Sequence, residues 1–216
     1  MFITIEGCDG AGKSTQAKEL ARRIANLGFE VVLTREPGGT PLGEQLRGVQ
    51  GWLKVGGSVS VLAELFLFEA ARSELITRVI KPAIRRGAVV ISDRYSDSSL
   101  AYQGYGRDID LSDIRKLNSV ATADLLPSLT VFLDIDLDVA LDRQASARGN
   151  IQNQDRFEDE NREFYQRVIN GYRELAAAEP ARWLTIDGEA SSEQISARIW
   201  TAVQRLIQKH TGTITP

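Results

Sequence analysis

The sequence predicts an α/β fold with a five-stranded parallel sheet and helices on both of its faces. Short runs that are nearly all apolar alternate with helical patterns along the chain, and such runs are expected of strands buried on both faces of a parallel sheet. Strand–helix–strand alternation also implies right-handed crossovers, which place helices on both faces. The strand candidates are FITIE (2–6), EVVLT (30–34), AVVISD (88–93), LTVFLDID (129–136) and RWLTID (182–187).

The stretches between these runs show the apolar spacing of amphipathic helices. In residues 13–27, apolar or small side chains recur every three or four positions and so share one face. Similar periodicity predicts helices over residues 60–86, 110–123, 158–178 and 190–208. No internal repeat or long linker divides the chain, so we expect one domain over residues 1–216.

Composition and charge limit the class of protein. The chain has 216 residues, of which 43% are hydrophobic and 25% charged, enough for one sizeable core. A net charge of −3 implies no broad basic surface, so we expect no nucleic-acid partner, although a small anionic substrate can bind where local charge is positive. No apolar run approaches the roughly 18–20 residues of a membrane span, and no leader segment is recognisable.

Two rare residue types add further limits. Cys8 is the only cysteine, so no intramolecular disulfide forms and a reducing, cytoplasmic location is expected. His210 is the only histidine and lies in the polar tail, residues 209–216, which we expect to fray. Catalysis by Ser-His-Asp or Cys-His groups is therefore excluded, as are most histidine-rich metal sites.

The segment GCDGAGKST, residues 7–15, joins the first strand candidate to the first helix candidate, and residues 7–14 match the pattern G-x-x-x-x-G-K-[ST]. Backbone N–H groups of such a loop converge on a phosphate chain, and the helix adds the positive end of its dipole. Lys13 reaches the β- and γ-phosphates, and the Ser14 hydroxyl ligates Mg²⁺. The sequence therefore predicts a P-loop NTPase fold that binds a nucleoside triphosphate through Gly7, Cys8, Asp9, Gly10, Ala11, Gly12, Lys13, Ser14 and Thr15.

Several other P-loop classes do not fit. A regulatory GTPase carries an N-K-x-D motif, which is absent, and a motor-type ATPase usually has Asp-Glu after an apolar strand, whereas TVFLDID has no adjacent glutamate. Adenylate-kinase-like loops place glycine where Ser14 stands. A small phosphotransferase remains, and it needs an acceptor site and cations that neutralise the transferred phosphoryl group.

Two segments suggest an acceptor site that binds a base. TREPGGT, residues 34–40, follows the second strand candidate, and ELFLFEAARSE, residues 64–74, lies on a predicted helix. Phe68 and Arg72 are four residues apart and share a helix face, where an aromatic ring beside a guanidinium can stack a base and bind its edge. The alternative for Phe68 is packing in the core.

A third segment lies where open α/β sheets bind ligands. SDRYSDSSLAYQG, residues 92–104, begins at the carboxyl end of a strand. There Asp93 could hold Mg²⁺ or water and Arg94 an acceptor phosphate, and the alternative is a structural salt bridge. A fourth segment, residues 144–157, is polar and has three arginines in or beside it, which fits either a solvated loop or a lid over the phosphates. The glycine-rich loop 51–60 receives no role.

These ordered motifs resemble those of thymidylate kinases of the bacterial-type branch, over roughly residues 2–205. The matching motifs are the phosphate loop, TREPGGT, LFxAxR, DRY with SxxAYQG, and the lid pattern RxxxxRG…DRFE. The resemblance implies that Lys13 holds the donor phosphates, Ser14 the Mg²⁺, and Asp9 the acceptor phosphate and metal, with Asp93 as a further metal ligand.

The resemblance also implies an arginine-rich lid over about residues 143–157. In the other branch of the family an arginine lies inside the phosphate loop, where this chain has Gly10. Arg148 would then reach the transferring phosphoryl group, with Arg143 near the donor nucleotide and Arg156 in support. Such an arginine is worth about 10³–10⁵ in rate in related phosphoryl transfers.

For the acceptor, the resemblance implies a thymine and phosphate pocket. Phe68 would stack on thymine, Arg72 would bind the base edge, and Arg94 would hold the acceptor phosphate. Tyr102 would crowd the sugar and disfavour a 2′-hydroxyl, and Ser99 would contact the ring. The remaining implied contacts are Glu36, Pro37, Arg47, Ser98 and Gln103.

The implied reaction is Mg²⁺-dependent transfer of the γ-phosphoryl group of ATP to dTMP, giving dTDP and ADP in dTTP biosynthesis, without a covalent enzyme intermediate. The implied assembly is a homodimer packed through long helices such as the one near residues 60–80. A kinase for another small nucleotide and a nucleotide-binding switch stay open as alternatives. Thymine and uracil differ by one methyl group, worth about 1–3 kcal/mol, so the sequence does not set the preference for dTMP over dUMP. No motif fixes the adenine pocket, for which residues 187–190 are a candidate.

Overall fold

The computed structural model describes residues 1–54, 59–148 and 158–211, and all five predicted strands form within these ranges. They are β1 (Phe2–Glu6), β2 (Val31–Arg35), β3 (Val89–Asp93), β4 (Leu129–Asp134) and β5 (Trp183–Asp187). The strands pair in parallel in the order β2-β3-β1-β4-β5. The predicted α/β fold with a five-stranded parallel sheet is therefore confirmed.

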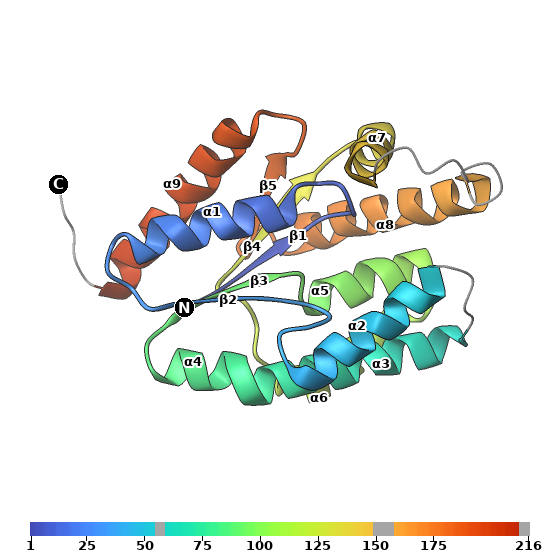
Figure 1. The fold of residues 1–216 in the computed structure, drawn as a ribbon, viewed down its shortest axis with the longest axis horizontal. Coiled ribbons are helices and arrows are strands. Elements are labelled where there is room, and N and C mark those ends of the chain that lie inside the picture. The colour runs from blue at the N-terminus through green and yellow to red at the C-terminus, as the bar shows by residue number, and fades with distance from the viewer. Residues whose placement is uncertain (55–58, 149–157, 212–216) are drawn as a thin grey trace.

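Helices cover both faces of this sheet (Figure 1). α1 (Lys13–Ala25) and α9 (Ser192–Thr211) lie on one side, and α2 (Pro41–Lys54), α3 (Val61–Leu75), α4 (Lys81–Arg85) and α6 (Leu111–Thr122) lie on the other. Two π-helical segments, η1 (Ile76–Ile80) and η2 (Leu100–Gly106), continue α3 and α5 (Ser96–Ser99). α7 (Leu137–Arg148) and α8 (Glu158–Ala178) follow β4.

The strands bury their side chains on both faces, as their apolar sequences predict. Ile3 and Ile5 of β1 pack in the cluster that contains α1 and α9, whereas Phe2 packs with η1 and α4 on the opposite face. Glu6 follows Phe2 and Thr4 on that second face and is completely buried. A buried carboxylate is costly unless hydrogen bonds satisfy it, so Glu6 must have partners near the site.

Two predicted loops turn out to be partly helical. The glycine-rich loop 51–60 contributes its first four residues to α2, and the polar segment 144–157 contributes its first five to α7. The amphipathic pattern is weak in α7, which is rich in charged and small residues, whereas α2 carries three glycines, which are typical of a loop. The other parts of the predicted lid, residues 149–157, lie outside the described residues.

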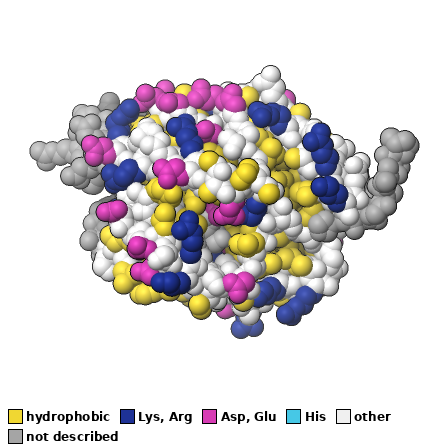
Figure 2. Space-filling view, turned by 180° about the vertical axis from the view of Figure 1, so that it is seen from behind, with side chains coloured by type: hydrophobic (Ala, Val, Ile, Leu, Met, Phe, Trp, Pro, Cys, Tyr) yellow, Lys and Arg dark blue, Asp and Glu magenta, His cyan; other side chains and the backbone are white. Residues whose placement is uncertain are grey.

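The predicted helix 60–86 forms as α3, η1 and α4 in succession, and Ser60 caps it by accepting a hydrogen bond from the Ala63 N–H at 3.3 Å. On the face shown in Figure 2, Lys and Arg side chains are interspersed with Asp and Glu and do not gather in one basic patch. None of the described helices combines the length and apolar content that a bilayer span requires.

Candidate active site

The phosphate loop connects the carboxyl end of β1 to the first residue of α1, as predicted. Gly7, Gly10 and Gly12 have φ angles of 142°, 89° and 91°, which residues other than glycine rarely adopt. A Cβ atom on Gly7 would lie 2.8 Å from the Leu133 carbonyl oxygen, so the loop needs glycine to pass this close to β4. These glycines cost backbone entropy on folding, and this loop conformation requires them.

The surroundings of Gly10 leave no room for a side chain such as that of arginine at this position of the loop. A Cβ atom at Gly10 would lie 2.5 Å from the carbonyl oxygen of Ala140 in α7. The same helix contacts the loop again through Gln144, whose Nε2 donates to the Asp9 carbonyl oxygen at 3.0 Å. α7 therefore occupies the space that a side chain at position 10 would need.

Lys13 lies beneath the loop and is almost buried, with 7% of its surface exposed. Its Nζ donates to the Cys8 carbonyl oxygen at 2.8 Å, which holds the loop closed over it. Burial, reinforced by the nearby Arg94 charge, lowers the pKa of Lys13 to about 8. An anion bound in the loop would stabilise the charged form and raise this pKa again.

Ser14, in the first turn of α1, contacts Asp93 at the carboxyl end of β3. The Ser14 hydroxyl donates to a carboxylate oxygen of Asp93, and Ser14 itself is exposed. Both groups offer hard oxygen ligands, which Mg²⁺ prefers, and Mg²⁺ commonly takes only one or two protein ligands beside substrate phosphates. No group of three acidic, histidine or cysteine side chains within the described ranges could hold a metal alone. The residues present therefore fit a Mg²⁺ ion shared with a nucleotide.

Arg94 pairs with the phosphate loop and not with its neighbour Asp93. Its Nη2 lies 2.6 Å from Asp9 Oδ1, and its Nη1 donates to the Gly7 carbonyl oxygen at 2.9 Å. Nη2 also donates to the Tyr102 hydroxyl at 2.9 Å. Arg94 has a φ of 72°, a conformation that is costly for residues other than glycine. A strained cation against the phosphate loop fits a residue that binds an anion.

Arg72 is buried on α3 and its guanidinium is fully hydrogen-bonded. Its Nε donates to Glu36 at 2.8 Å, and Nη1 donates to Glu69 at 2.6 Å and Asn118 at 2.8 Å. Nη2 donates to Ser99 Oγ at 3.0 Å and to a backbone carbonyl oxygen. The predicted residues Glu36, Arg72 and Ser99 therefore lie together, held by an arginine whose five N–H groups all have protein acceptors.

The carboxylates around Arg72 are not fully neutralised. One guanidinium faces both Glu36 and Glu69, and one oxygen of each carboxylate is buried without a hydrogen-bond partner in the described structure. Burial raises the pKa of Glu36 to about 7, which the charge of Arg72 opposes and that of Glu69 reinforces.

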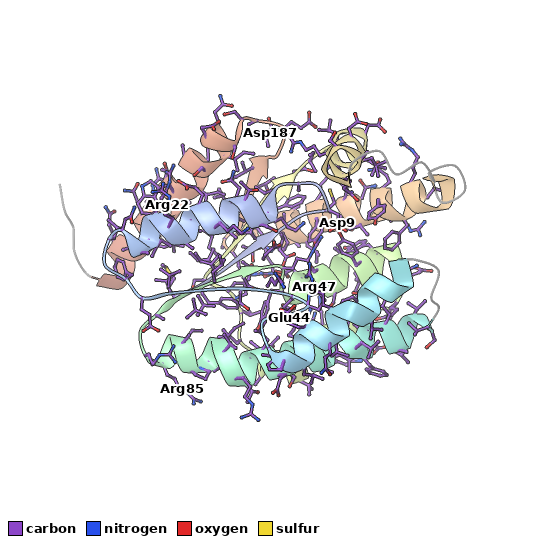
Figure 3. The ribbon with its side chains drawn as sticks, viewed as in Figure 1. Asp9, Arg22, Glu44, Arg47, Arg85 and Asp187 are labelled. Atoms are coloured by element: carbon purple, nitrogen blue, oxygen red, sulfur yellow. The ribbon has the colours of Figure 1, made fainter. Side chains whose placement is uncertain are left out.

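The other predicted acceptor residues surround the same end of the sheet. Phe68 is half-buried and belongs to none of the three core clusters of the described residues, so the core alternative is not favoured. Gln103 donates to Glu64 at 2.8 Å, and Arg47 donates to the Pro37 carbonyl oxygen at 3.2 Å. Figure 3 shows Arg47 and Asp9 at this end of the sheet, whereas Arg22 and Arg85 lie at the opposite end.

Of the predicted lid arginines, only the side chain of Arg143 is described. Its Nη1 donates to the Gly188 carbonyl oxygen at 2.9 Å, so α7 is tied to the segment suggested for adenine. The side chains of Arg148 and Arg156 lie outside the described part of the structure. Their predicted roles stay predictions.

The structure adds Glu6 and Tyr172, which the sequence analysis did not identify. Tyr172 comes from α8, and its hydroxyl lies 3.1 Å from Arg94 Nη1 and 3.0 Å from Glu6 Oε2. No local motif marks Tyr172, since 78 positions separate it from Arg94. Glu6 carried one signal, an acidic residue ending an otherwise apolar buried strand.

Comparison with known proteins bears on the whole of this site. The family model described as thymidylate kinase matches residues 5–199. The thymidylate kinase of Dehalococcoides mccartyi strain 195 is 47% identical over 208 residues, which cover 96% of this chain and 98% of that protein. The thymidylate kinase of a Synechococcus species is 48% identical over 204 residues, 94% of each chain.

The fold agrees with the sequence comparison. The crystal structure of thymidylate kinase from Ehrlichia chaffeensis superposes with a TM-score of 0.76 at 33% identity, covering 94% of this chain and 98% of that one. The family model spans the phosphate loop and the segments that carry Arg72 and Arg94. The chain belongs to the thymidylate kinase family.

Proposed function

We propose that this chain transfers the γ-phosphoryl group of ATP to dTMP, giving dTDP and ADP, with the residues described above in stated roles. Membership of the thymidylate kinase family supports the ATP-dependent phosphorylation of dTMP. One observation carries the assignment of roles. The Arg94 guanidinium lies directly against the phosphate loop, 2.9 Å from the Gly7 carbonyl oxygen, so a phosphate on Arg94 would adjoin a triphosphate in the loop.

On the donor side, the loop N–H groups and Lys13 bind the β- and γ-phosphates. Ser14 and Asp93, with Asp9 beside them, would hold Mg²⁺. When bound, Mg²⁺ would neutralise phosphate charge and align the donor. Asp9 accepts from Arg94 at 2.6 Å and so fixes the cation that faces the acceptor phosphate.

On the acceptor side, Arg94 binds the phosphate of dTMP and Phe68 stacks on its base. Base stacking on an aromatic side chain is worth about 1–3 kcal/mol. Arg72 and Ser99 lie behind this position, and a thymine contact with Arg72 would replace one of its protein acceptors. Tyr102, fixed through its hydroxyl by Arg94, limits the room at the sugar.

The remaining groups complete the site. Glu36, Pro37, Arg47, Ser98 and Gln103 line the acceptor pocket. Arg143 contacts the nucleotide, and Arg148 reaches the transferring phosphoryl group when the lid excludes water. Catalysis then consists of positioning and charge neutralisation, without a covalent enzyme intermediate. We place the enzyme in the cytoplasm.

We further propose that the enzyme is a homodimer. Helix α3 exposes Val61, Leu62 and Phe66, with 38%, 51% and 49% of their surfaces accessible. Leu62 and Phe66 are four residues apart and share a face of the helix. An exposed apolar helix face of this kind is typical of an interface.

An assay of ADP release with ATP, Mg²⁺ and each nucleoside monophosphate in turn tests the reaction. We expect strong turnover with dTMP and near-background turnover with UMP and AMP. ATP binding without acceptor-dependent turnover would contradict the proposal and favour a nucleotide-binding switch.

The Arg148→Ala variant tests the lid assignment in the same assay. We expect kcat to fall by about 10³-fold or more, since the cation that stabilises the transferring group is lost, whereas ATP affinity stays close to wild type. Arg78→Ala is a matched control, because Arg78 is exposed and, within the described ranges, pairs with Glu74 on its own helical stretch. Unchanged turnover of Arg148→Ala would show that the assignment is wrong.

A further inference from the structure

Glu6 is a buried carboxylate that the proposed mechanism does not use. It is the last residue of β1, directly before the phosphate loop, and none of its surface is exposed. Oε1 accepts from the Tyr95 N–H at 2.7 Å. Oε2 accepts from the Ser98 hydroxyl at 2.6 Å and from the Tyr172 hydroxyl at 3.0 Å. Both oxygens therefore point at groups that adjoin Arg94.

The same two hydroxyls are acceptors for Arg94. Its Nη1 lies 3.2 Å from Ser98 Oγ and 3.1 Å from the Tyr172 hydroxyl oxygen. A guanidinium N–H can only donate. One N–H of Nη1 donates to the Gly7 carbonyl oxygen, so the two hydroxyl oxygens share the second as acceptors, and their own protons must point elsewhere. The hydroxyls lie 2.8 Å apart, so one can donate to the other, but at least one proton must go to Glu6. Glu6 thus sets the hydrogen-bond direction of both hydroxyls.

We propose that Glu6 and Tyr172 are positioning residues that orient the Arg94 guanidinium toward the acceptor phosphate. Glu6 draws the hydroxyl protons of Ser98 and Tyr172 to itself, which leaves two oxygen acceptors facing Arg94 Nη1. One hydroxyl always separates Glu6 from Arg94, so Glu6 orients the cation without a direct ion pair that would compete with phosphate. The inference rests on the proposed role of Arg94.

The charge state of Glu6 gives the mechanism a pH dependence. Burial and the Asp97 carboxylate raise the pKa of Glu6 to about 7, whereas Ser98, Arg94 and Tyr172 lower it. Asp97 is itself paired with Arg182 at 2.6 Å. Ionised Glu6 predominates above about pH 7 and accepts hydrogen bonds from the two hydroxyls, whereas protonated Glu6 becomes a donor and loses this effect.

Two conservative variants separate this role from folding. Tyr172→Phe removes one acceptor but keeps the ring, which stacks on Phe132 with centroids 5.4 Å apart. Glu6→Gln keeps the shape, but its amide N–H₂ donates to the hydroxyls and so reverses their direction. Tyr95→Phe is a matched control, because Tyr95 is equally buried but its hydroxyl donates to the Leu125 carbonyl oxygen.

Steady-state kinetics with both substrates varied test the proposal. For Tyr172→Phe and Glu6→Gln we expect the KM for dTMP to rise about tenfold, with a lower kcat and a KM for ATP within about twofold of wild type. Tyr95→Phe keeps wild-type values. Between pH 6 and 8, we expect kcat/KM for dTMP to rise more in wild type than in Glu6→Gln, because the glutamine side chain does not titrate. An unchanged KM for dTMP in both variants, or equal rises in both KM values, would overturn the proposal.

A double-mutant cycle separates this inference from the role of Arg94. Calorimetric titration of dTMP measures binding to Arg94→Ala, Glu6→Gln and the double variant. If Glu6 acts through Arg94, Glu6→Gln costs nothing further in the Arg94→Ala background. Additive losses would overturn the inference and leave Arg94 in its role. Unchanged binding by Arg94→Ala would instead contradict the proposed role of Arg94.

Discussion

Two buried cations at the proposed site illustrate how burial would prepare side chains to bind phosphate. Arg94 is largely shielded from solvent. It lies among uncharged hydroxyls, a backbone carbonyl group and one carboxylate, Asp9. Within the described residues, the hydrogen-bond partner of Lys13 Nζ is the Cys8 carbonyl oxygen. Both charges are desolvated before substrate arrives, so phosphate does not have to displace a full water shell from them.

The lowered pKa of Lys13 leads to a pH prediction. Its pKa of about 8 means that Lys13 loses its charge as pH rises through this value, and the neutral amine no longer attracts phosphates. We expect kcat/KM for ATP to fall between pH 7 and 9.5, with an apparent pKa near 8. At saturating ATP the bound phosphates keep Lys13 charged, so kcat serves as the control and stays nearly constant. A flat kcat/KM for ATP over this range would contradict the prediction.

Residues within one continuous motif were the easiest to predict. The phosphate loop, Asp93 and Arg94 each follow a strand at the sheet edge where ligands bind, and all lie there in the structure. Tyr172 could not be predicted, because it meets Arg94 only after α8 packs against η2. The pairing of Arg94 with Asp9 likewise depends on two strands lying side by side, which no local pattern contains.

At the scale of elements, close packing of α8 on η2 determines how Tyr172 reaches the site. Gly171 lies beside Tyr172, and a Cβ atom on it would lie 2.5 Å from the Tyr105 ring. η2 itself has π-helical geometry, which is frequent at functional sites, and it carries Tyr102 and Gln103. Glycine at position 171 therefore allows two site-bearing elements to touch.

Two glycine-to-alanine variants test this packing. Gly171→Ala should destabilise the protein by about 1–3 kcal/mol through overpacking, and should raise the KM for dTMP because Tyr172 moves. Gly48→Ala is the matched control, since Gly48 lies in α2 with no atom within 4 Å of an added Cβ. It should stabilise by about 0.4–1 kcal/mol through lower unfolded-state entropy. Urea unfolding measures both changes, and shifts of the same sign would argue against the packing account.

Strands were predicted better than helices for a physical reason. Burial on both faces leaves a strand few polar residues, so short apolar runs stand out in the sequence, as β1 and β3 do. α7 has almost no apolar stripe, because its residues share their contacts among the phosphate loop, the β5–α9 connection and α8. Its periodicity therefore carries little signal, and the predicted loop 144–157 began five residues too early.

At the scale of the whole molecule, α3 exposes apolar side chains that its packing within one chain leaves uncovered. In proteins with a parallel sheet, each helix buries one of its own faces. α3 packs on α2 and α6. Leu62 and Phe66 nevertheless expose about half of their surfaces. A second copy of the chain would cover this face.

The oligomeric state tests this interpretation. Phe66→Glu and Leu62→Glu place a carboxylate in the proposed interface, so we expect a monomer where wild type has the mass of a dimer. Leu27→Glu is the control, because Leu27 is similarly exposed, at 54%, but follows α1 at the other end of the molecule. Light scattering after size exclusion gives the mass, and a wild-type monomer at micromolar concentration would contradict the dimer.

The contact between Gly10 and α7 limits which residues the phosphate loop can accept at position 10. A single codon change that put arginine at position 10 would drive its Cβ into the Ala140 carbonyl group, only 2.5 Å away. α7 would first have to withdraw, and with it the contacts of Gln144 and Arg143. Arginine at position 10 would therefore need a shift of α7 in addition to the substitution itself. The residue at position 10 and the packing of α7 on the loop would have to change together, so a substitution in the loop alone would meet a steric cost.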